Sequence, residues 1–308
     1  MKVNVLTPIR FGGPFKWGQD LVSLLNKNDL QATHIHTLFS LSKSCLYQNV
    51  DIVHTTAPFP FRLWKKPIVF TIHGDYTIEA NIWQRFIPKT ITRADAITVP
   101  SQYLKQKLGL DEAVVIPNAV FPQRFKPAQH GDKDELNLVT IMSFYFPDKV
   151  RGLLNIIEIL GKVRNCRLKY TIVGGGPYLE KIKHQINVIK KVAVKFTGFL
   201  PEPKPVLATS DVFLYYSYHD SFSIPILEAM ASGLPVITNN FGPPSEIIDN
   251  EKNGYIAESD ESYLKYLLSL LGDYKLRQKI GQNARAKTEE KFNWDKVVDR
   301  YIQIYNKF

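Results

Sequence analysis

The stretch DVFLYYSYHDSFSIPILEAMASGLPVITN (residues 211–239) contains two short apolar runs on either side of a helix pattern. The runs at 211–216 and 235–239 are typical of buried strands, and the segment 225–233 predicts a helix that begins beside a proline. A strand, a helix and a second strand in this order place the two strands parallel in one sheet. The rest of the chain repeats this unit in both directions.

Strand and helix patterns alternate along nearly all of the 308 residues. Further strands are predicted at 3–8, 32–36, 51–55, 67–74, 94–101, 113–118, 136–143, 168–174 and 194–199. Further helices are predicted at 17–27, 101–109, 150–162, 177–189, 260–271, 273–291 and 293–306. The alternation predicts the α/β class, with parallel sheets covered by helices on both faces.

The composition changes at residues 121–135, where Pro, Lys and Asp replace the periodic pattern. We interpret this stretch as the linker between two Rossmann-like βα domains that face each other across a cleft. The predicted boundaries are 1–125 for the N-terminal domain and 126–292 for the C-terminal domain. A final helix, 293–308, is expected to return to the N-terminal domain.

Charge and cysteine content narrow the possible partners and compartments. The net charge of +10 favours anionic partners, but the cations are scattered and no zinc-finger or RNP-like motif occurs, so we do not expect nucleic acid binding. Cys45 and Cys166 form no CxxC motif, which argues against a disulfide framework and fits the cytoplasm. The first residues contain no long apolar region, so no signal peptide is expected, and no run of eighteen apolar residues occurs, so no membrane-spanning segment is expected.

Two acids flank the start of the predicted helix 225–233. Asp220 follows a strand, where it could accept hydrogen bonds from sugar hydroxyls, and Glu228 lies one turn into the helix, where it could bind a ribose diol. The backbone N–H groups of the loop between them could bind a diphosphate. Alternatively, Glu228 is a helix-dipole acid and Asp220 a turn acid. The residue pattern alone leaves both readings open.

Three other strand ends carry candidate residues. Gly12 and Gly13 precede a helix and could let backbone N–H groups approach a phosphate, or they form a plain turn. His73 ends a strand beside a glycine, where it could contact a sugar or phosphate, or bond only to its loop. The glycines at 174–176 lack the spacing of a dinucleotide-binding loop, so they indicate a strand-to-helix turn rather than NAD binding.

These residues resemble the retaining glycosyltransferases of family 4, which have the GT-B fold. The resemblance rests on Asp220-x7-Glu228 followed by AMASGLPVIT and GPPSEIIDNEKNGYI, and on FTIHG at 70–74. It also rests on VKFTGFLP at 194–201 and on the match of ADAITVPSQYLKQKL and VIPNAV to the end of an N-terminal domain.

The resemblance implies that residues 1–125 form an acceptor-binding domain and residues 126–292 a nucleotide-sugar donor-binding domain. It also implies a role for each matched residue. Gly13, with Gly12 beside it, would contact the donor phosphates, and His73 would face the transferred sugar. Asp220 would bind the sugar and Glu228 the ribose. The remaining donor contacts would come from the base neighbours Phe199 and Leu200 and from the loop residues Ser221, Phe222, Ser223 and Ile224.

The chain departs from the family pattern at two places. Asp220 stands where the family has Glu, and the family's Gly-Arg pair after the first strand of the second domain is missing from IMSFYFPDKVRG. Lys149 and Arg151 remain as candidates to neutralise the leaving diphosphate. We therefore keep open which of these two cations does so.

The implied activity is transfer of a sugar, with retention of configuration, from a nucleotide-diphosphate sugar to a hydroxyl of a glycan, lipid-linked or small-molecule acceptor. No metal site and no cofactor are expected, since no carboxylate pair has convincing metal spacing. Alternatives are a nucleotide-sugar epimerase or phosphorylase on the same fold, and a non-catalytic sugar-nucleotide-binding subunit.

Two stretches suggest peripheral attachment to the inner face of the membrane. FGGPFKWG (11–18) and FPFRLWKK (59–66) mix Phe and Trp with Lys and Arg, which is the combination that interfacial binding favours. Alternatively, the aromatic rings pack inside the protein and the cations are merely solvated. A soluble acceptor is compatible with either arrangement.

Overall fold

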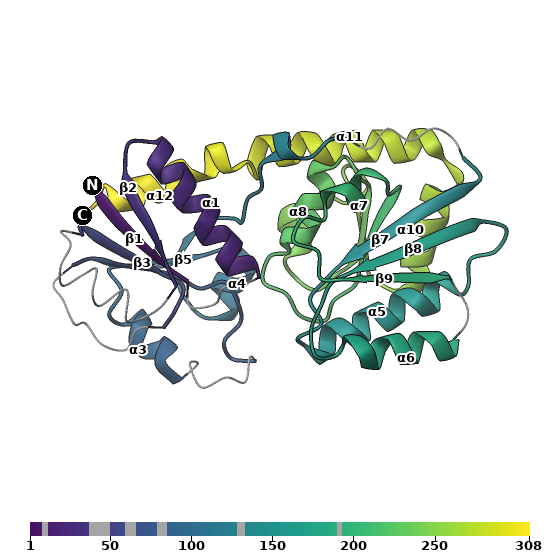
Figure 1. Ribbon diagram of the computed structural model, residues 1–308, viewed down its shortest axis with the longest axis horizontal. Coiled ribbons are helices and arrows are strands. Elements are labelled where there is room, and N and C mark those ends of the chain that lie inside the picture. The colour runs from purple at the N-terminus through teal and green to yellow at the C-terminus, as the bar shows by residue number, and fades with distance from the viewer. Residues whose placement is uncertain (8–11, 37–49, 59–65, 79–84, 128–132, 190–192) are drawn as a thin grey trace. The chain divides into compact units, whose positions relative to one another are not determined.

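The computed structural model describes residues 1–7, 12–36, 50–58, 66–78, 85–127, 133–189 and 193–308. They form two units, each with its own sheet (Figure 1). Unit 1 comprises Met1–Ala119 and Phe292–Phe308, and unit 2 comprises Val120–Lys291. Unit 1 is therefore built from both ends of the chain, and unit 2 from one continuous segment.

Unit 1 contains a six-stranded parallel sheet in the order β2-β1-β3-β4-β5-β6. Its strands are β1 (Lys2–Leu6), β2 (Gln31–Ile35), β3 (Ile52–Thr55), β4 (Ile68–Thr71), β5 (Ala96–Val99) and β6 (Val114–Val115). All residues of β3 and β4 are buried, as expected of central strands covered on both faces. The carboxyl ends of the central strands are where polar side chains become available for a site.

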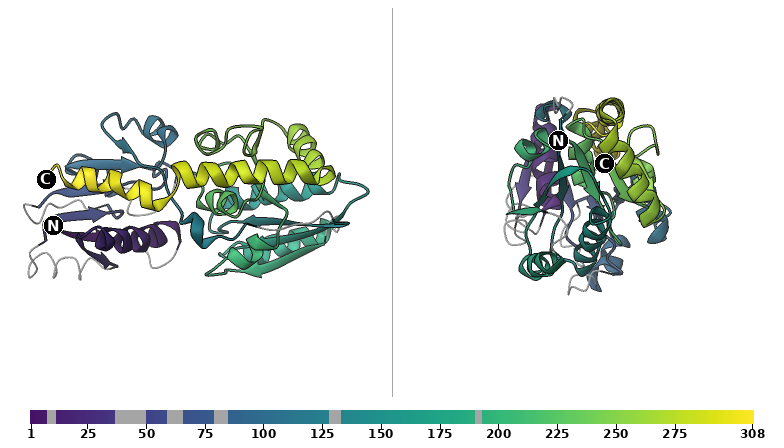
Figure 2. Two further views of the ribbon diagram at one scale, coloured as in Figure 1. Left: turned by 90° about the horizontal axis from the view of Figure 1, so that it is seen from above. Right: turned by 90° about the vertical axis from the view of Figure 1, so that its right-hand side faces the viewer.

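The helices of unit 1 include one from the end of the chain. They are α1 (Gly13–Lys27), α3 (Ile87–Ile91), α4 (Gln102–Lys107) and α12 (Trp294–Tyr305). Helix α12 runs beside α1, as two views show (Figures 1 and 2). The Trp17 indole of α1 donates a 3.2 Å hydrogen bond to the Tyr301 hydroxyl of α12.

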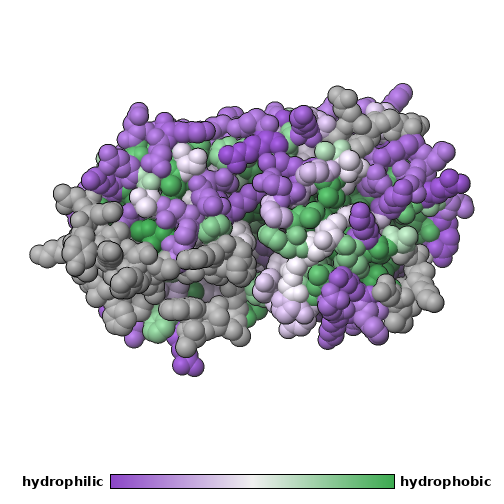
Figure 3. All heavy atoms as spheres, in the orientation of Figure 1, coloured by the Kyte–Doolittle hydropathy of each residue, from purple (hydrophilic) through white to green (hydrophobic). Residues whose placement is uncertain are grey.

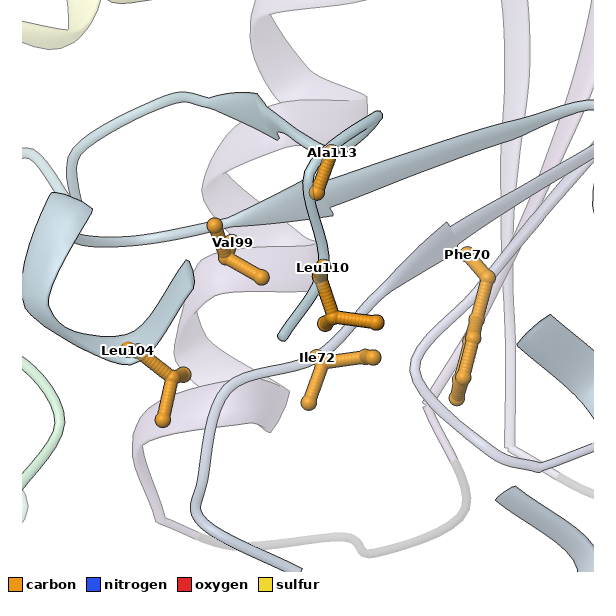
Figure 4. Packing of buried hydrophobic residues seen from close by; sticks show 6 residues of the cluster. All are labelled: Phe70, Ile72, Val99, Leu104, Leu110 and Ala113. Atoms are coloured by element: carbon orange, nitrogen blue, oxygen red, sulfur yellow. The ribbon is translucent and has the colours of Figure 1, made fainter. Parts of the chain in front are cut away.

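A hydrophobic cluster fixes the end of β4 against β5 and α4. Its buried members are Phe70, Ile72, Val99, Leu104, Leu110 and Ala113 (Figure 4). Ser101 caps α4 by accepting a hydrogen bond from the Leu104 N–H group, which holds Leu104 in this cluster. Because Ile72 packs here, the next residue, His73, leaves the sheet at a defined place.

Unit 2 contains a second six-stranded parallel sheet, in the order β12-β11-β10-β7-β8-β9. Its strands are β7 (Glu135–Ile141), β8 (Arg167–Val173), β9 (Val194–Gly198), β10 (Val212–Tyr215), β11 (Val236–Asn239) and β12 (Tyr255–Ala257). Its helical elements are η2 (Pro122–Arg124), α5 (Pro147–Leu160), α6 (Leu179–Ile189), α7 (Lys204–Ala208), α8 (Ile224–Ala231), α9 (Pro244–Ile247), α10 (Asp260–Gly272) and α11 (Tyr274–Lys291).

The predicted α/β class and the two Rossmann-like domains are confirmed. The strand β12 and the short helices α3, α7 and α9 were not predicted, because three to five residues carry too little periodicity to recognise. The structure divides the chain at 119/120 and 291/292, where the sequence interpretation placed boundaries at 125/126 and 292/293.

Helix α11 is the longest helix among the described residues, and it is rich in charged residues and only weakly amphipathic. It spans 18 residues with the sequence YKLRQKIGQNARAKTEEK, and the surface near it is largely hydrophilic (Figure 3). Across the part of the chain that the structure describes, no helix combines the length and the apolar character needed to cross a membrane.

Candidate functional site

In unit 2, the loop between β10 and α8 holds Asp220 in a defined position. The Asn239 amide at the end of β11 bonds to the backbone of Ser217 twice, through Ser217 N–H at 2.8 Å and Ser217 carbonyl at 2.8 Å. The Ser217 hydroxyl in turn donates to the His219 carbonyl at 2.8 Å. The Ser221 N–H group then donates to the Asp220 carboxylate at 2.9 Å. The loop is thus tied to β11 before it reaches the acid.

Lys149 lies against Asp220 at the edge of this sheet. The ammonium and the carboxylate are 2.7 Å apart, and their side chains are 11% and 20% exposed. The Tyr215 hydroxyl accepts a hydrogen bond from Lys149 at 2.5 Å and donates one to Asp220 at 2.6 Å. Three side chains from α5, β10 and the following loop therefore form one hydrogen-bonded cluster.

A glycine explains how α5 comes close enough to deliver Lys149. A Cβ atom at position 152 would lie 2.1 Å from the Tyr216 carbonyl oxygen, so only glycine permits this approach of α5 to the end of β10. Gly152 lies in the same helix as Lys149, which is therefore held opposite the Asp220 loop.

The cluster keeps its charges at neutral pH. Burial disfavours the Lys149 ammonium, but Asp220 and Tyr215 more than offset this and raise its pKa above the usual value. Burial alone would raise the pKa of Asp220, yet Lys149, Tyr215 and the Ser221 N–H group hold it below the usual value. Burial and the nearby Asp220 raise the pKa of Tyr215 to about 12. The cluster is thus an ammonium, a carboxylate and a neutral phenol.

Arg151 lies apart from this cluster. Its guanidinium stacks over the Tyr218 ring at 4.0 Å, and the residue is exposed. The Tyr218 hydroxyl donates to the Asn155 side chain at 3.1 Å, on the same helix as Arg151. Of the two predicted cations, the structure brings only Lys149 to Asp220.

The N-terminus of α8 follows directly. Ser223 is the N-cap residue and is 2% exposed, and its hydroxyl oxygen has no hydrogen-bond partner among the described residues. Pro225 removes one N–H group from the first turn. Glu228, one turn further, is 4% exposed. A buried hydroxyl, backbone N–H groups and a buried acid thus follow one another beside Asp220.

Three consecutive glycines, at 174–176, follow β8 and lie beside the end of β9. Cβ atoms at Gly174 and Gly176 would come within 2.4 Å of the backbone of Met142 and Phe144, so both positions require glycine. A Cβ atom at Gly175 would lie 3.1 Å from Phe199. Phe199 itself is 67% exposed, and Leu200 next to it is partly buried. The sequence interpretation of 174–176 as a turn is confirmed, and its tightness explains the glycines.

In unit 1, Gly12 and Gly13 begin α1. Gly12 has a φ of +85°, a conformation that side chains rarely adopt, while a Cβ atom there would meet nothing within 4 Å. The requirement for glycine is therefore conformational rather than steric. With Pro14 next, the first turn presents the N–H groups of Gly13 and Phe15.

His73 leaves the end of β4 and packs edge-on against Trp17, with ring centroids 4.8 Å apart. Trp17 also contacts the fully buried His54 at 5.1 Å. Burial lowers the pKa of His73 to about 4 and, with the neighbouring His73, that of His54 to about 3. Both imidazoles are therefore neutral near pH 7, so His73 can exchange hydrogen bonds but cannot neutralise a phosphate.

The membrane hypothesis is wrong for one of its residues. Trp17 is 2% exposed and packs against His54, His73 and Tyr301, so its ring cannot insert into a lipid surface. Residue 11 and residues 59–65 lie outside the described residues.

Comparison with known proteins gives the family. Residues 123–287 match the model of the family described as "Glycosyl transferases group 1", and residues 2–124 match "Glycosyltransferase Family 4". The chain belongs to this group of glycosyltransferases.

Individual relatives agree with the assignment. The chain is 31% identical over 290 residues to the N-acetyl-alpha-D-glucosaminyl L-malate synthase of Bacillus anthracis, covering 84% of this chain and 75% of that one. A glycosyltransferase of Rickettsia africae has a TM-score of 0.79 at 17% identity, covering 99% and 98% of the two chains. The Anabaena protein Alr3699/HepE in complex with UDP-glucose has a TM-score of 0.79 at 16% identity, with full coverage of both chains. The fold of this glycosyltransferase is GT-B.

The sequence analysis missed two residues of the glycosyltransferase's unit 2 site: Tyr215, a member of the cluster, and Asn239, which ties the Asp220 loop to β11. The sequence places Tyr215 in an apolar strand and Asn239 at a strand end. A hydroxyl on a buried strand and an amide at the end of the next strand were the available signals. Among the described residues, no group of three or more His, Cys, Asp or Glu side chains is placed to hold a metal ion.

Proposed function

We propose that this glycosyltransferase moves a sugar from a nucleotide-diphosphate sugar to an acceptor hydroxyl with retention of configuration, using the Lys149–Asp220 cluster of unit 2. The main support is the 2.7 Å ion pair between Lys149 and Asp220, because Asp220 lies three residues before Ser223, the N-cap of α8. Breaking the glycosidic bond leaves negative charge on the diphosphate, and a cation beside helix N–H groups stabilises that charge.

The remaining unit 2 residues receive roles consistent with their positions. The Ser223 hydroxyl and the N–H groups of Ser221 to Ile224 bind the diphosphate, and Glu228 binds the ribose. Phe199 and Leu200 lie beside the base. Asp220 accepts hydrogen bonds from the hydroxyls of the sugar.

In unit 1, Gly12 and Gly13 contribute helix N–H groups to the phosphates, and His73 faces the sugar as a neutral hydrogen-bonding group. The acceptor oxygen attacks the anomeric carbon while the bond to the diphosphate breaks. The acceptor proton passes to the departing phosphate oxygen on the same face. No metal ion or cofactor enters this scheme.

The donor and the acceptor are proposed as classes. UDP sugars are the first donors to test, because HepE was crystallised with UDP-glucose. The acceptor is a hydroxyl of a glycan, a lipid-linked sugar or a small molecule. If the acceptor is lipid-linked, the enzyme works at the inner face of the membrane, and co-sedimentation with anionic vesicles would detect this.

Glu228→Ala tests the donor site. Loss of a charge-assisted bond to the ribose, worth about 1.5–3 kcal/mol, should weaken nucleotide-sugar binding at least about tenfold. Calorimetry with a panel of nucleotide sugars measures this. Glu261→Ala is the matched control, because Glu261 is an exposed acid in the first turn of α10 and should leave donor binding unchanged.

The same assay separates the alternatives. Release of nucleoside diphosphate together with a glycosylated acceptor supports transfer. Binding of nucleotide sugar without release identifies a non-catalytic binding subunit. Unchanged affinity in Glu228→Ala would show that Glu228 acts only on the helix dipole, as Glu261 does.

A further inference from the structure

The Tyr215 hydroxyl occupies the centre of the unit 2 cluster. It accepts from Lys149 at 2.5 Å and donates to Asp220 at 2.6 Å, while those two side chains touch each other at 2.7 Å. The Tyr215 ring is 2% exposed and is fixed by Phe213 and Phe241, with ring centroids 6.3 and 5.9 Å away. The packing of the buried ring holds the hydroxyl in the cluster.

The arrangement gives Asp220 more partners than the ion pair alone requires. Its carboxylate accepts from Lys149, from Tyr215 and from the Ser221 N–H group at 2.9 Å. In the proposed reaction, a diphosphate competes with Asp220 for the Lys149 ammonium. When Lys149 turns to the diphosphate, Tyr215 and Ser221 remain bonded to the carboxylate.

We propose that Tyr215 is a positioning residue, whose hydroxyl keeps the Asp220 carboxylate ionised and in place while Lys149 serves the leaving diphosphate. This inference rests on the proposed sugar transfer. It assigns Tyr215 a role that the resemblance does not give it, and it accounts for a short acid at this position. An aspartate carboxylate lies in reach of both the Tyr215 hydroxyl and Lys149, and a glutamate would carry its carboxylate one methylene further.

The physical reason lies in the cost of an unpaired buried carboxylate. A partly buried acid that loses its cation takes up a proton unless hydrogen-bond donors stabilise its charged form. The groups that shift the pKa of Asp220 are Lys149 from α5, Tyr215 from β10 and the Ser221 N–H group of its own loop. Removing the Tyr215 hydroxyl therefore raises the pKa of Asp220.

Tyr215→Phe tests this through the pH profile of sugar transfer. We expect kcat to fall about tenfold, with the KM for the donor changed by less than about threefold. The acid limb of the kcat profile should move to higher pH, because Asp220 is protonated more easily. A matched control is Tyr170→Phe, which removes another buried hydroxyl, bonded to Thr140 at 2.6 Å, from strand β8, two positions from β10 in the same sheet. The control should keep the wild-type acid limb.

A double variant isolates the contact. If Tyr215 acts through the Asp220 charge, then Tyr215→Phe should have little further effect on kcat in an Asp220→Asn background. Equal loss of activity from Tyr215→Phe in both backgrounds would overturn the proposal.

Urea unfolding tests the same contact without any activity measurement. The folded-state pKa of Asp220 is depressed, so its stabilisation is present above the unfolded pKa and is lost as pH falls through the folded pKa. Wild type should therefore lose more stability between about pH 5 and pH 2 than Tyr215→Phe does. Identical acid losses in both proteins would overturn the inference. Wild-type protein that transfers no sugar would instead overturn the proposed function.

Discussion

Each unit buries a polar cluster beside its predicted site residues, and the two clusters differ in charge. In unit 1, the fully buried His54 bonds to the Tyr305 hydroxyl at 2.5 Å and to the Thr71 hydroxyl at 2.6 Å, and Thr71 bonds to Thr98. In unit 2, Lys149 and Asp220 form an ion pair. In the neutral unit 1 cluster, both ring nitrogens of His54 have a hydroxyl partner. The unit 2 cluster instead holds two opposite charges that an anionic ligand can separate.

This difference indicates which cluster can exchange its internal contacts for contacts with a ligand. Neutral hydrogen-bonded groups stabilise a fold but offer an anion little gain. A partly exposed ion pair can exchange its anion for another one at low cost, because its cation is already desolvated. We therefore expect the unit 1 cluster to support the fold and the unit 2 cluster to exchange its ion pair for contacts with an anionic ligand.

Lys149→Met should break the unit 2 cluster with the largest effect. Leaving Asp220 without its cation is expected to cost about 3 kcal/mol of stability. Loss of the charge that faces the leaving diphosphate should lower kcat at least about 100-fold. Thermal unfolding and a sugar-transfer assay measure the two effects.

Arg151→Met is the control for that experiment. Arg151 lies two residues later on α5 but is exposed and stacks on Tyr218. It should change stability by less than about 1 kcal/mol and leave kcat within about threefold of wild type. A larger loss of kcat in Arg151→Met than in Lys149→Met would reverse the assignment of the two cations.

Tyr305→Phe should break the neutral cluster of unit 1. It leaves a nitrogen of the buried His54 ring without its hydroxyl partner, which costs about 1–3 kcal/mol. Tyr301→Phe, on the same helix, removes a longer bond of 3.2 Å from Trp17 and should cost less. Urea unfolding followed by hydrogen exchange in β3 and β4 resolves unit 1. Equal stability of Tyr305→Phe and wild type would show that the His54 contact contributes nothing.

Lowering the pH from 7 to 5.5 should reduce the stability of unit 1. The pKa of His54 is depressed to about 3, so between that value and about 6.5 the unfolded chain binds a proton that the folded chain does not. The pKa values of His34 and His73, also in unit 1, are depressed to about 4. Each of the three histidines should therefore contribute up to about 1.4 kcal/mol per pH unit to the loss of unit 1 stability as pH drops from 6.5 towards 4. Exchange rates of β3 amides at pH 7 and 5.5 measure this. Rates that imply constant stability would mean that the pKa values of these histidines are not depressed in the folded protein.

Long periodic elements were predictable from the sequence. The helix predicted at 293–306 is observed as Trp294–Tyr305, and the strand predicted at 136–143 as Glu135–Ile141. Their patterns repeat over enough residues to exceed local noise. Helix α9, with four residues, and strand β12, with three, depend on tertiary contacts, which a single sequence does not reveal.

The site was predictable where polar residues follow strands and not where they face one another. Lys149 and Asp220 were both named, but nothing in a separation of 71 residues indicates that they touch. Tyr215 was missed because an apolar neighbourhood favours its ring over its hydroxyl as the reason for its presence. Trp17 was misplaced because a tryptophan among cations suits a membrane surface and a protein core equally well.

The composition of unit 1 also has a consequence for biosynthesis. Its sheet is made from the first 119 residues, but the Trp17 indole and the His54 ring find their partners on α12, at residues 301 and 305. Domains generally fold as their residues leave the ribosome. Unit 2 is one continuous segment and can fold before residues 292–308 are translated. Unit 1 is therefore begun first during synthesis but completes its folding last. Until α12 is translated, Trp17 and His54 lack their hydrogen-bond partners Tyr301 and Tyr305.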